Sequence, residues 1–293
     1  MKIFITGGSG LIGQYLNAEL SQAHDILTQY NSHTGNCENF NSVKISIADY
    51  DALAKVFKTF KPDWVIHTAA ISNAEKADSL SADLVYEINV TASERLAELC
   101  RKNKTKLIYT SSDLVYAGYR GSLLTEDAKL IPISLYAETK LMGEVKIRKL
   151  LQNHLILRTA LQFGFGINHS RSHFQFVYEE LKAGRKVKLF ADQYRSALSL
   201  QETARMIAEL IKKEVNGVTL NFGGEQRVSR YDLGKAICSY CGFDEKLLEP
   251  VTMEGVNAMY KVPDVSMNIN KLKQIGILPK PFLVSVEEVL RGR

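Results

Sequence analysis

The chain has 293 residues, of which 45% are hydrophobic and 24% charged, enough for one large domain or one and a half with a substantial core. The formal net charge is +5, from 37 basic and 32 acidic residues, and the basic side chains are scattered along the chain. This distribution argues against dedicated nucleic-acid binding and is compatible with small anionic ligands.

The sequence also indicates where the protein works. It contains no run of about 18 apolar residues, so we expect no membrane span. A first strand that begins at Lys2 leaves no room for a signal peptide. Four cysteines without a secretory signal favour a reducing compartment, and these are Cys37, Cys100, Cys238 and Cys241. We therefore expect a cytoplasmic protein.

The first stretch of the chain has the pattern of a strand, a glycine turn and a helix. Residues 2–6 form an apolar run typical of a parallel strand covered on both faces, and helical spacing begins at Leu11. Gly7 permits a sharp bend, Gly10 lets backbone N–H groups approach a phosphate, and Gly13 allows the helix to pack closely on the strand. We expect a dinucleotide pyrophosphate here, contacted by Gly7, Gly10, Leu11, Ile12 and Gly13. The alternative is an ordinary strand-to-helix turn.

The end of the second predicted strand, Asp25–Tyr30, indicates which nicotinamide cofactor fits. An acidic residue there would favour NAD, because it accepts hydrogen bonds from the ribose 2′-OH. No carboxylate follows Tyr30; Asn31 and Ser32 could instead bond a 2′-phosphate, with His33 beside it. We therefore expect NADPH, with NADH as an alternative. A polar loop that contacts nothing is the other interpretation.

Strands and helices alternate through the first half of the chain. Strands are predicted at Val43–Ile47, Asp63–His67 and Lys106–Thr110, and helices at Tyr50–Phe60, with Asp49 as N-cap, and about Ala82–Asn103. This alternation predicts a Rossmann-type α/β fold, a doubly wound parallel sheet with helices on both faces. Ligands of such sheets bind beyond the carboxyl ends of the strands, so Gly7, Ala70 and Ser112 should line one crevice.

Two features beside these elements suggest contacts. Ala69 and Ala70 directly follow the fourth strand, and such small residues let a flat ring or a ribose lie against the backbone. Asn89 lies inside the long helical pattern. An asparagine there is usually solvated or bonded locally, but one aimed at the core could hold a water or a carbonyl.

Tyr136 and Lys140 are four residues apart on a predicted helix and therefore lie on one face. A free tyrosine has a pKa of about 10, and we expect the lysine ammonium to lower it. A serine hydroxyl such as that of Ser112 can orient a carbonyl between itself and the tyrosine. We therefore predict a proton-delivery unit of Ser112, Tyr136 and Lys140 for a carbonyl that receives hydride. The alternative is a pair on a surface helix.

Together these motifs resemble the extended short-chain dehydrogenase/reductase family. The resemblance is carried by Gly7-x-x-Gly10-x-x-Gly13, His67–Ala70, Asn89, Ser112 and Tyr136-x-x-x-Lys140. Within that family the chain is most similar to the dTDP-4-dehydrorhamnose reductases, through Ser111–Gly118, Arg158-Thr159, Asp192-Gln193 and Asn268–Leu272. The resemblance covers nearly the whole chain.

This resemblance implies a reaction and roles for its residues. Tyr136 would be the general acid, Lys140 would hold the nicotinamide ribose, and Ser112 would align the C4 carbonyl of a nucleotide-linked 4-keto-6-deoxysugar. It also implies an adenine contact at Ile47 and a substrate contact at Asp113. Reduction would give a 4-hydroxy sugar nucleotide.

The second half of the chain is less regular. A loop is predicted at Asn168–Ser172, helices at about 174–183, 201–213 and 230–241, and a strand at Val218–Phe222 that returns to the main sheet. Arg195 lies where related epimerases often have an arginine that meets a diphosphate, so it is either a substrate phosphate ligand or a surface arginine. We expect a dinucleotide-binding domain of residues 1–160 with about 196–225, and a smaller α/β substrate-binding domain of about 161–195 and 226–293.

Two further spacings are compatible with metal binding. Cys238-x-x-Cys241 lies in a helical pattern without a second pair, and His169 and His173 lack a third ligand. We interpret the cysteines as buried helix residues and expect no metal site.

We therefore expect an NADPH-dependent reductase of a keto-sugar nucleotide, with no nucleic-acid or membrane partner and with a homodimer as an option. The first alternative is an epimerase or dehydratase that keeps NAD bound, although dehydratases usually carry Asp-Glu where this chain has Asp113-Leu114. The second is a non-catalytic regulatory subunit that keeps the cofactor pocket, since regulatory subunits of methionine adenosyltransferase resemble this branch.

Overall fold

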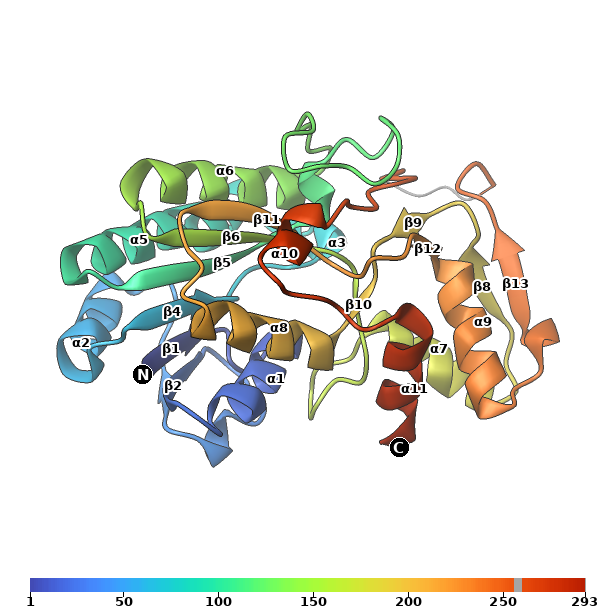
Figure 1. Cartoon of the computed structure of the whole chain (residues 1–293), viewed down its shortest axis with the longest axis horizontal. Coiled ribbons are helices and arrows are strands. Elements are labelled where there is room, and N and C mark those ends of the chain that lie inside the picture. Colours follow the sequence, from blue (N-terminus) through green and yellow to red (C-terminus); the bar gives the residue numbers. More distant parts are fainter. Residues whose placement is uncertain (256–259, 293) are drawn as a thin grey trace.

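A large parallel sheet forms the centre of the protein, whose computed structural model describes residues 1–255 and 260–292. The sheet is 7-stranded, in the order β11-β6-β5-β4-β1-β2-β3 (Figure 1). Its strands are β1 (Lys2–Thr6), β2 (Asp25–Tyr30), β3 (Ser42–Lys44), β4 (Trp64–His67), β5 (Lys106–Ser112), β6 (His154–Thr159) and β11 (Val218–Phe222). Every neighbouring pair is parallel. The predicted Rossmann-type fold is therefore confirmed, and β11 returns to the main sheet as expected.

Helices cover both faces of this sheet because its strands are apolar on both sides. Ile3 and Ile5 of β1 face α1 and α8, whereas Phe4 faces the opposite core, since successive side chains of a strand point to opposite faces. One face carries α1 (Leu11–Leu20) and α8 (Leu200–Lys212), and the other carries α2 (Tyr50–Phe60), α5 (Ala92–Asn103) and α6 (Leu135–Leu150), as Figure 1 shows. None of the helices in the described ranges has the length and apolar character needed to cross a bilayer.

The third strand is shorter than predicted. The sequence suggested Val43–Ile47, but β3 ends at Lys44. Lys44 pairs with Tyr30, the last residue of β2, so the backbone beyond it has little partner strand left to pair with. The Ile45 carbonyl accepts a hydrogen bond from Gln29 Nε2 at 2.6 Å instead. The chain then turns into α2, whose predicted N-cap Asp49 accepts from the Ala52 N–H at 3.0 Å.

The long helix predicted from Ala82 to Asn103 is helical throughout but not uniformly α. It consists of α4 (Ala82–Tyr86), a π-helical turn (Glu87–Thr91) and α5 (Ala92–Asn103). The π turn contains Asn89, whose side chain is buried and bonds outside the helix. A single π turn inside an α-helix is often found at functional sites.

A second group of elements packs around its own core beside the large sheet (Figure 1). Its helices are α7 (His173–Lys182), α9 (Arg230–Cys241) and α11 (Phe282–Arg291). Three two-stranded sheets belong to this half, formed by β7 (Gln162–Phe163) with β10 (Leu198–Ser199), β9 (Tyr194–Arg195) with β12 (Val228–Ser229), and β8 (Val187–Phe190) with β13 (Leu248–Val251). The remaining short elements are α3 (Ala74–Asp78), α10 (Asn270–Gln274) and 3₁₀ turns at Cys37–Asn39, Asp113–Val115 and Glu245–Leu247.

The final third of the chain contacts both cores. Phe282 and Val286 of α11 pack in the core of the second group, whereas Leu272 of α10 packs in the core of the large sheet. The division into a dinucleotide part (1–160 and about 196–225) and a substrate part (about 161–195 and 226–293) stays our proposal. Residues 256–259 and 293 of the latter lie outside the described residues.

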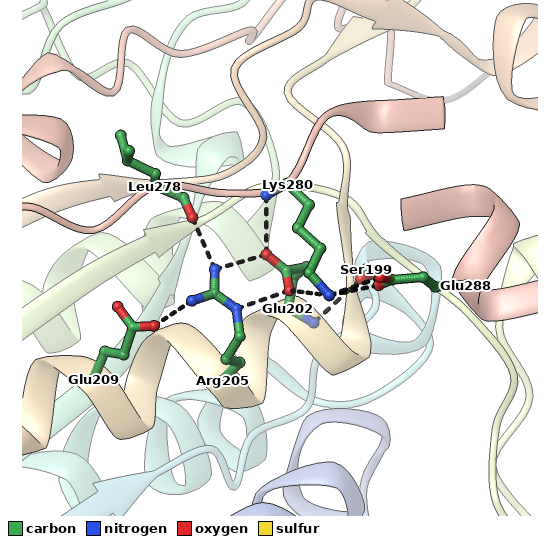
Figure 2. A network of polar contacts seen from close by, with 7 residues as sticks. All are labelled: Ser199, Glu202, Arg205, Glu209, Leu278, Lys280 and Glu288. Carbon is green, nitrogen blue, oxygen red and sulfur yellow. Dashed lines mark hydrogen bonds and ion pairs between the residues drawn. The ribbon is translucent and has the colours of Figure 1, made fainter. Parts of the chain in front are cut away.

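A buried carboxylate joins α8 to the segment that leads into α11 (Figure 2). Glu202 is 2% exposed and receives two hydrogen bonds of 2.8 Å from Arg205 and one of 3.0 Å from the Lys280 backbone N–H. Arg205 also donates to the Leu278 carbonyl at 2.8 Å. This network holds the segment before α11 against α8, one of the helices that cover the large sheet.

Candidate active site

A cleft of about 910 Å³ lies beyond the carboxyl ends of the central strands. Most of the predicted site residues line it, namely Gly7, Gly10, Leu11, Ile12, Asn31, Ser32, Ile47, Ala69, Ala70, Ser112, Asp113, Tyr136 and Arg195. Gly13 and Lys140 are buried and are not among the lining residues. The structure therefore brings together side chains and backbone groups that are far apart in the sequence.

The glycine turn between β1 and α1 has the close packing that the sequence predicts. Gly7 has φ +70, in the left-handed region that glycine adopts without strain, and its carbonyl accepts a 2.9 Å hydrogen bond from Gly10 N. A Cβ built on Gly13 would lie 2.2 Å from the Gly7 oxygen. Only glycine at position 13 lets α1 approach the turn this closely, and α1 therefore begins at the edge of the cleft.

The segment after β4 is held in the cleft wall by Asn89. The Asn89 side-chain oxygen accepts from Ile71 N at 2.8 Å, and its amide nitrogen donates to Ile71 O at 3.1 Å and to Thr139 Oγ at 3.0 Å. Ile71 follows Ala69 and Ala70 and lines the cleft with them. Asn89 is therefore aimed at the core and holds a carbonyl, one of the two options that the sequence left open.

A chain of buried hydrogen bonds continues below Asn89. Ser93 Oγ donates to the Asn89 carbonyl at 2.7 Å, so it accepts from His67 Nε2 at 2.9 Å. The other ring nitrogen of His67 then accepts from Thr6 Oγ1 at 2.7 Å. Burial lowers the pKa of His67 to about 3, so the ring stays neutral and the direction of each bond is defined. This chain links the ends of β1 and β4 to the π turn.

Ser112 and Tyr136 face the cleft together from β5 and α6. Ser112 Oγ accepts from the Leu114 N–H at 3.1 Å and donates to Asp113 Oδ1 at 3.3 Å. Burial raises the pKa of Tyr136 to about 12, although its hydrogen bond with Ser112 acts in the opposite direction. The phenol is therefore protonated at neutral pH.

Lys140 lies one turn behind Tyr136 and is buried. Its ammonium nitrogen is 4.2 Å from the centre of the Tyr109 ring. Burial lowers the pKa of Lys140 to about 7, although the negative charge of Glu144 acts to raise it. The sequence predicts that Lys140 lowers the pKa of Tyr136, but burial dominates and raises that pKa, because it disfavours the charged tyrosinate. Burial likewise disfavours the ammonium of Lys140, and therefore lowers the pKa of the lysine.

The far end of the cleft contains buried charges. Arg195 is 5% exposed and its Nε lies 3.7 Å from Asp113 Oδ2, so the interpretation as a surface arginine is wrong. Burial raises the pKa of Asp113, opposed by Arg195. Asp113 Oδ2 has no hydrogen-bond partner within the described residues. A buried carboxylate oxygen in this position can accept a hydrogen bond from a ligand hydroxyl.

Sequence reasoning missed Arg230, which also lines this end of the cleft. It is the first residue of α9, directly after the N-cap Ser229, and its Nε donates to Gln193 at 3.0 Å. Burial and the nearby Arg195 lower its pKa to about 10, so it remains charged at neutral pH. A basic residue at a helix N-terminus is unfavourable, because it opposes the helix dipole. This placement is the feature of the sequence that could have indicated a functional role for Arg230.

The candidate metal spacings do not converge. Cys238 and Cys241 are free cysteines on α9, and His169 stacks on His33 whereas His173 begins α7. Within the described residues no group of three or more His, Cys, Asp or Glu side chains could hold a metal ion.

A doubly wound sheet with a glycine turn after β1, and with serine, tyrosine and lysine at the ends of β5 and on α6, is the arrangement of the short-chain dehydrogenase/reductase class. The comparison with protein families agrees. The family described as RmlD substrate binding domain matches residues 1–292, and the chain belongs to this family.

Individual relatives have different described roles. The probable low-salt glycan biosynthesis reductase Agl14 of Haloferax volcanii is 29% identical over 260 residues, 86% of this chain and 84% of that protein. Methionine adenosyltransferase 2 subunit beta of Xenopus laevis is 27% identical over 304 residues, 99% of this chain and 87% of that protein. The crystal structure of dTDP-4-dehydrorhamnose reductase from Bacillus anthracis in complex with NADP has a TM-score of 0.87 at 24% identity, covering 100% and 99% of the two chains, and shows the shared fold.

Proposed function

We propose that the protein is an NADPH-dependent reductase of the C4 carbonyl of a nucleotide-linked 4-keto-6-deoxysugar, acting in the manner of dTDP-4-dehydrorhamnose reductases. The observation that carries this proposal is the placement of Ser112 and Tyr136 in one cleft with the glycine turn. The reductase relatives support the reaction type. The free cysteines support a cytoplasmic location.

The residues of the cleft fit a dinucleotide, since a Cβ at Gly13 would disrupt the turn that cradles a pyrophosphate. In this proposal Gly7, Gly10, Leu11, Ile12 and Gly13 form the pyrophosphate site. Asn31 and Ser32 would bond the 2′-phosphate, Ile47 would contact adenine, and Ala69, Ala70, Tyr136 and Lys140 would hold the nicotinamide half. When bound, NADPH supplies the hydride.

The chain's own groups would manage the proton and the orientation. The hydroxyl of Ser112 would turn its single hydrogen from Asp113 to the sugar carbonyl and so align that carbonyl. Tyr136, which is protonated at neutral pH, would give its proton to the carbonyl oxygen. Lys140 is charged in part of the molecules near pH 7, and a positive charge close to the phenol stabilises the tyrosinate left by that transfer.

The buried charges at the other end suit a sugar nucleotide. Arg195 and Arg230 both line the cleft, and two guanidinium groups can bind the oxygens of a diphosphate. Asp113 Oδ2, which has no hydrogen-bond partner among the described residues, would accept a hydrogen bond from a sugar hydroxyl.

The test follows the oxidation of NADPH in the presence of dTDP-4-keto-6-deoxymannose. Tyr136→Phe should lower kcat about a hundredfold or more, because it removes the general acid. Tyr240→Phe, an exposed tyrosine on α9, serves as the matched control. Turnover like that of the unmodified protein in Tyr136→Phe would refute this role.

A second candidate is a subunit of a larger enzyme, favoured by the 27% identity to methionine adenosyltransferase 2 subunit beta across 99% of this chain. This candidate predicts dinucleotide binding without turnover, and co-purification with a catalytic subunit. Steady NADPH oxidation by the isolated chain with a keto-sugar nucleotide would decide for the reductase.

A further inference from the structure

Two histidines from distant parts of the sequence stack at the mouth of the cleft. His33 follows β2, and His169 lies in the loop between β7 and α7. Their ring centroids are 4.6 Å apart with an interplanar angle of 30°, and both residues line the cleft. The proposed reaction does not use either ring.

The position of this pair is set by β2. In doubly wound dinucleotide-binding folds, residues at the end of this strand read the 2′ position of the adenosine ribose. Asn31 and Ser32 occupy that end here, and His33 comes next in the chain. The stacked imidazoles therefore lie where the 2′-phosphate that distinguishes NADP from NAD would be placed.

Hydrogen bonds hold the loop with His169 against the glycine turn. Gln14 Nε2 of α1 donates to the Ile167 carbonyl at 3.0 Å, and Tyr15 OH donates to the Phe165 carbonyl at 2.8 Å. Ser170 Oγ donates to Ser9 O at 3.3 Å. Because these bonds flank His169 on both sides, the ring is kept beside His33.

The charges around the pair leave it without an anionic partner from the cleft wall. The charged side chains among the described lining residues are Lys76, Asp113, Arg171, Arg195 and Arg230. Asp113 is paired with Arg195, and Arg171 forms an ion pair with Glu179 of α7. Tyr30 is the other titratable lining side chain from β2. Burial and the neighbouring His33 lower the pKa of His169, so protonation of the His169 ring is unfavourable until an anion arrives.

We propose that His33 and His169 form the subsite for the adenosine 2′-phosphate, and that they take up protons when it binds, so that the preference for NADP(H) over NAD(H) falls as the pH rises. The inference rests on the proposed dinucleotide-binding function. A dianionic phosphate favours the charged form of both rings, and each charged ring can donate a hydrogen bond to a phosphate oxygen.

The sign of the pH dependence follows from linkage. A histidine that gains a phosphate partner has a higher pKa in the complex than in the free protein. The added affinity is complete below the free pKa and is lost as the pH rises through the pKa of the complex. Below a pH of about 6 the 2′-phosphate itself becomes protonated, so the measurement belongs above that value.

The experiment measures the Kd of NADP⁺ and of NAD⁺ by calorimetry on the full chain at pH 6.5, 7.5 and 8.5, in two buffers of different ionisation enthalpy. We expect proton uptake with NADP⁺ but not with NAD⁺. The NADP⁺ preference should fall about tenfold or more across this range, because each linked proton contributes up to a factor of about 10 per pH unit.

The variants are His33→Gln, His169→Gln and the double variant, with His24→Gln, outside the cleft lining, as the matched control. Each single change should weaken NADP⁺ binding about tenfold, the loss expected for one hydrogen bond to a charged group, and leave the Kd of NAD⁺ unchanged. The unchanged Kd of NAD⁺ also shows that the variants are folded. The double variant should show no pH dependence of the preference.

A preference for NADP⁺ that stays constant with pH, or that keeps its pH dependence in the double variant, would overturn the subsite. If the unmodified protein bound neither dinucleotide, the proposed function itself would fall, and the subsite with it. These outcomes are distinguishable because NAD⁺ binding tests the cleft without testing the histidine pair.

Discussion

The two ends of the cleft use different kinds of groups. The end beside β1 and β2 consists of the glycine turn and the neutral side chains of Asn31 and Ser32, whereas the opposite end contains the buried charges of Asp113 and Arg195. Backbone N–H groups at a helix N-terminus bind a phosphate through partial positive charges, whereas buried charged side chains bind a ligand through full charges. The difference implies that substitutions at one end should change the binding of one ligand and leave the other alone.

The largest expected effect lies between the two ends, at Lys140. Lys140→Met should reduce kcat about a hundredfold, because the charge that stabilises the tyrosinate is lost. The same change should raise the melting temperature at pH 7, by roughly 2–4 °C for each kcal/mol recovered. The measurements are NADPH oxidation and thermal unfolding, with the exposed Lys149→Met as control.

The sign of this stability effect follows from burial. The pKa of Lys140 is about 7 in the folded protein, below the ordinary value of 10.5, so the unfolded chain binds the proton more tightly. The free energy of unfolding therefore rises with pH between these two values. Below the folded pKa the lysine is protonated in both states, and its buried charge lowers the stability of the folded protein. A lower melting temperature for Lys140→Met would contradict this account.

At the cofactor end, Gly13→Ala should weaken the binding of both NADP⁺ and NAD⁺ by roughly 10–100-fold, the cost of an overpacked contact. The new Cβ would lie 2.2 Å from Gly7 O, so the turn must move. Calorimetry measures the two Kd values, and Gly292→Ala is the control because its Cβ would meet nothing within 4 Å. Unchanged Kd values would show that the turn does not contact the dinucleotide.

At the substrate end, Arg230→Gln should raise the KM for the sugar nucleotide about tenfold, because one charged hydrogen-bond donor to the diphosphate is removed. The KM for NADPH should not change. Steady-state kinetics with each substrate varied in turn gives both values, and Arg185→Gln, on the surface, is the control. A parallel rise in both KM values would mean that the two ends are not separate.

The smallest effect should come from the network outside the cleft (Figure 2). Glu202→Gln should lower the free energy of unfolding by about 1–3 kcal/mol, since a buried charged partner of Arg205 is lost, and should leave both KM values unchanged. Thermal unfolding measures the first, with the exposed Glu245→Gln as control.

This stabilisation should also depend on pH. Burial tends to raise the pKa of Glu202, but Arg205 and the Lys280 backbone outweigh it and hold the pKa below its ordinary value. The contribution is therefore complete above the unfolded pKa of about 4.3 and is lost as the pH falls through the folded pKa. An equal acid sensitivity in Glu202→Gln would contradict this role.

The cofactor end could be predicted from the sequence because its geometry requires particular residues at short spacing. Glycines at positions 7, 10 and 13 directly after an apolar strand are readable locally, and so are Asp49 as an N-cap and the Tyr136–Lys140 spacing. At the substrate end Asp113 and Arg195 were predicted only through the family resemblance, and Arg230 was missed. Arg230 reaches the cleft through the packing of α9, which no local pattern encodes.

Three further features could not be predicted from local sequence patterns. The pKa of Tyr136 depends on burial, which only the folded structure provides. The end of β3 depends on where its partner β2 ends, and an apolar run such as Val43–Ile47 carries no information about that partner. The π turn inside the predicted helix was missed because hydrophobic spacing averages over one irregular turn.

That π turn has a consequence for how the helix could be altered. A π turn accommodates one residue more than the α-helix around it, so deleting a single residue within Glu87–Thr91 would allow an uninterrupted α-helix. The shortened helix would have a more regular backbone, yet its first half would be rotated relative to the rest, and the Asn89 amide would no longer meet the Ile71 peptide. The extra residue thus makes the helix less regular, but it places the Asn89 amide where it holds the wall of the cleft at Ile71.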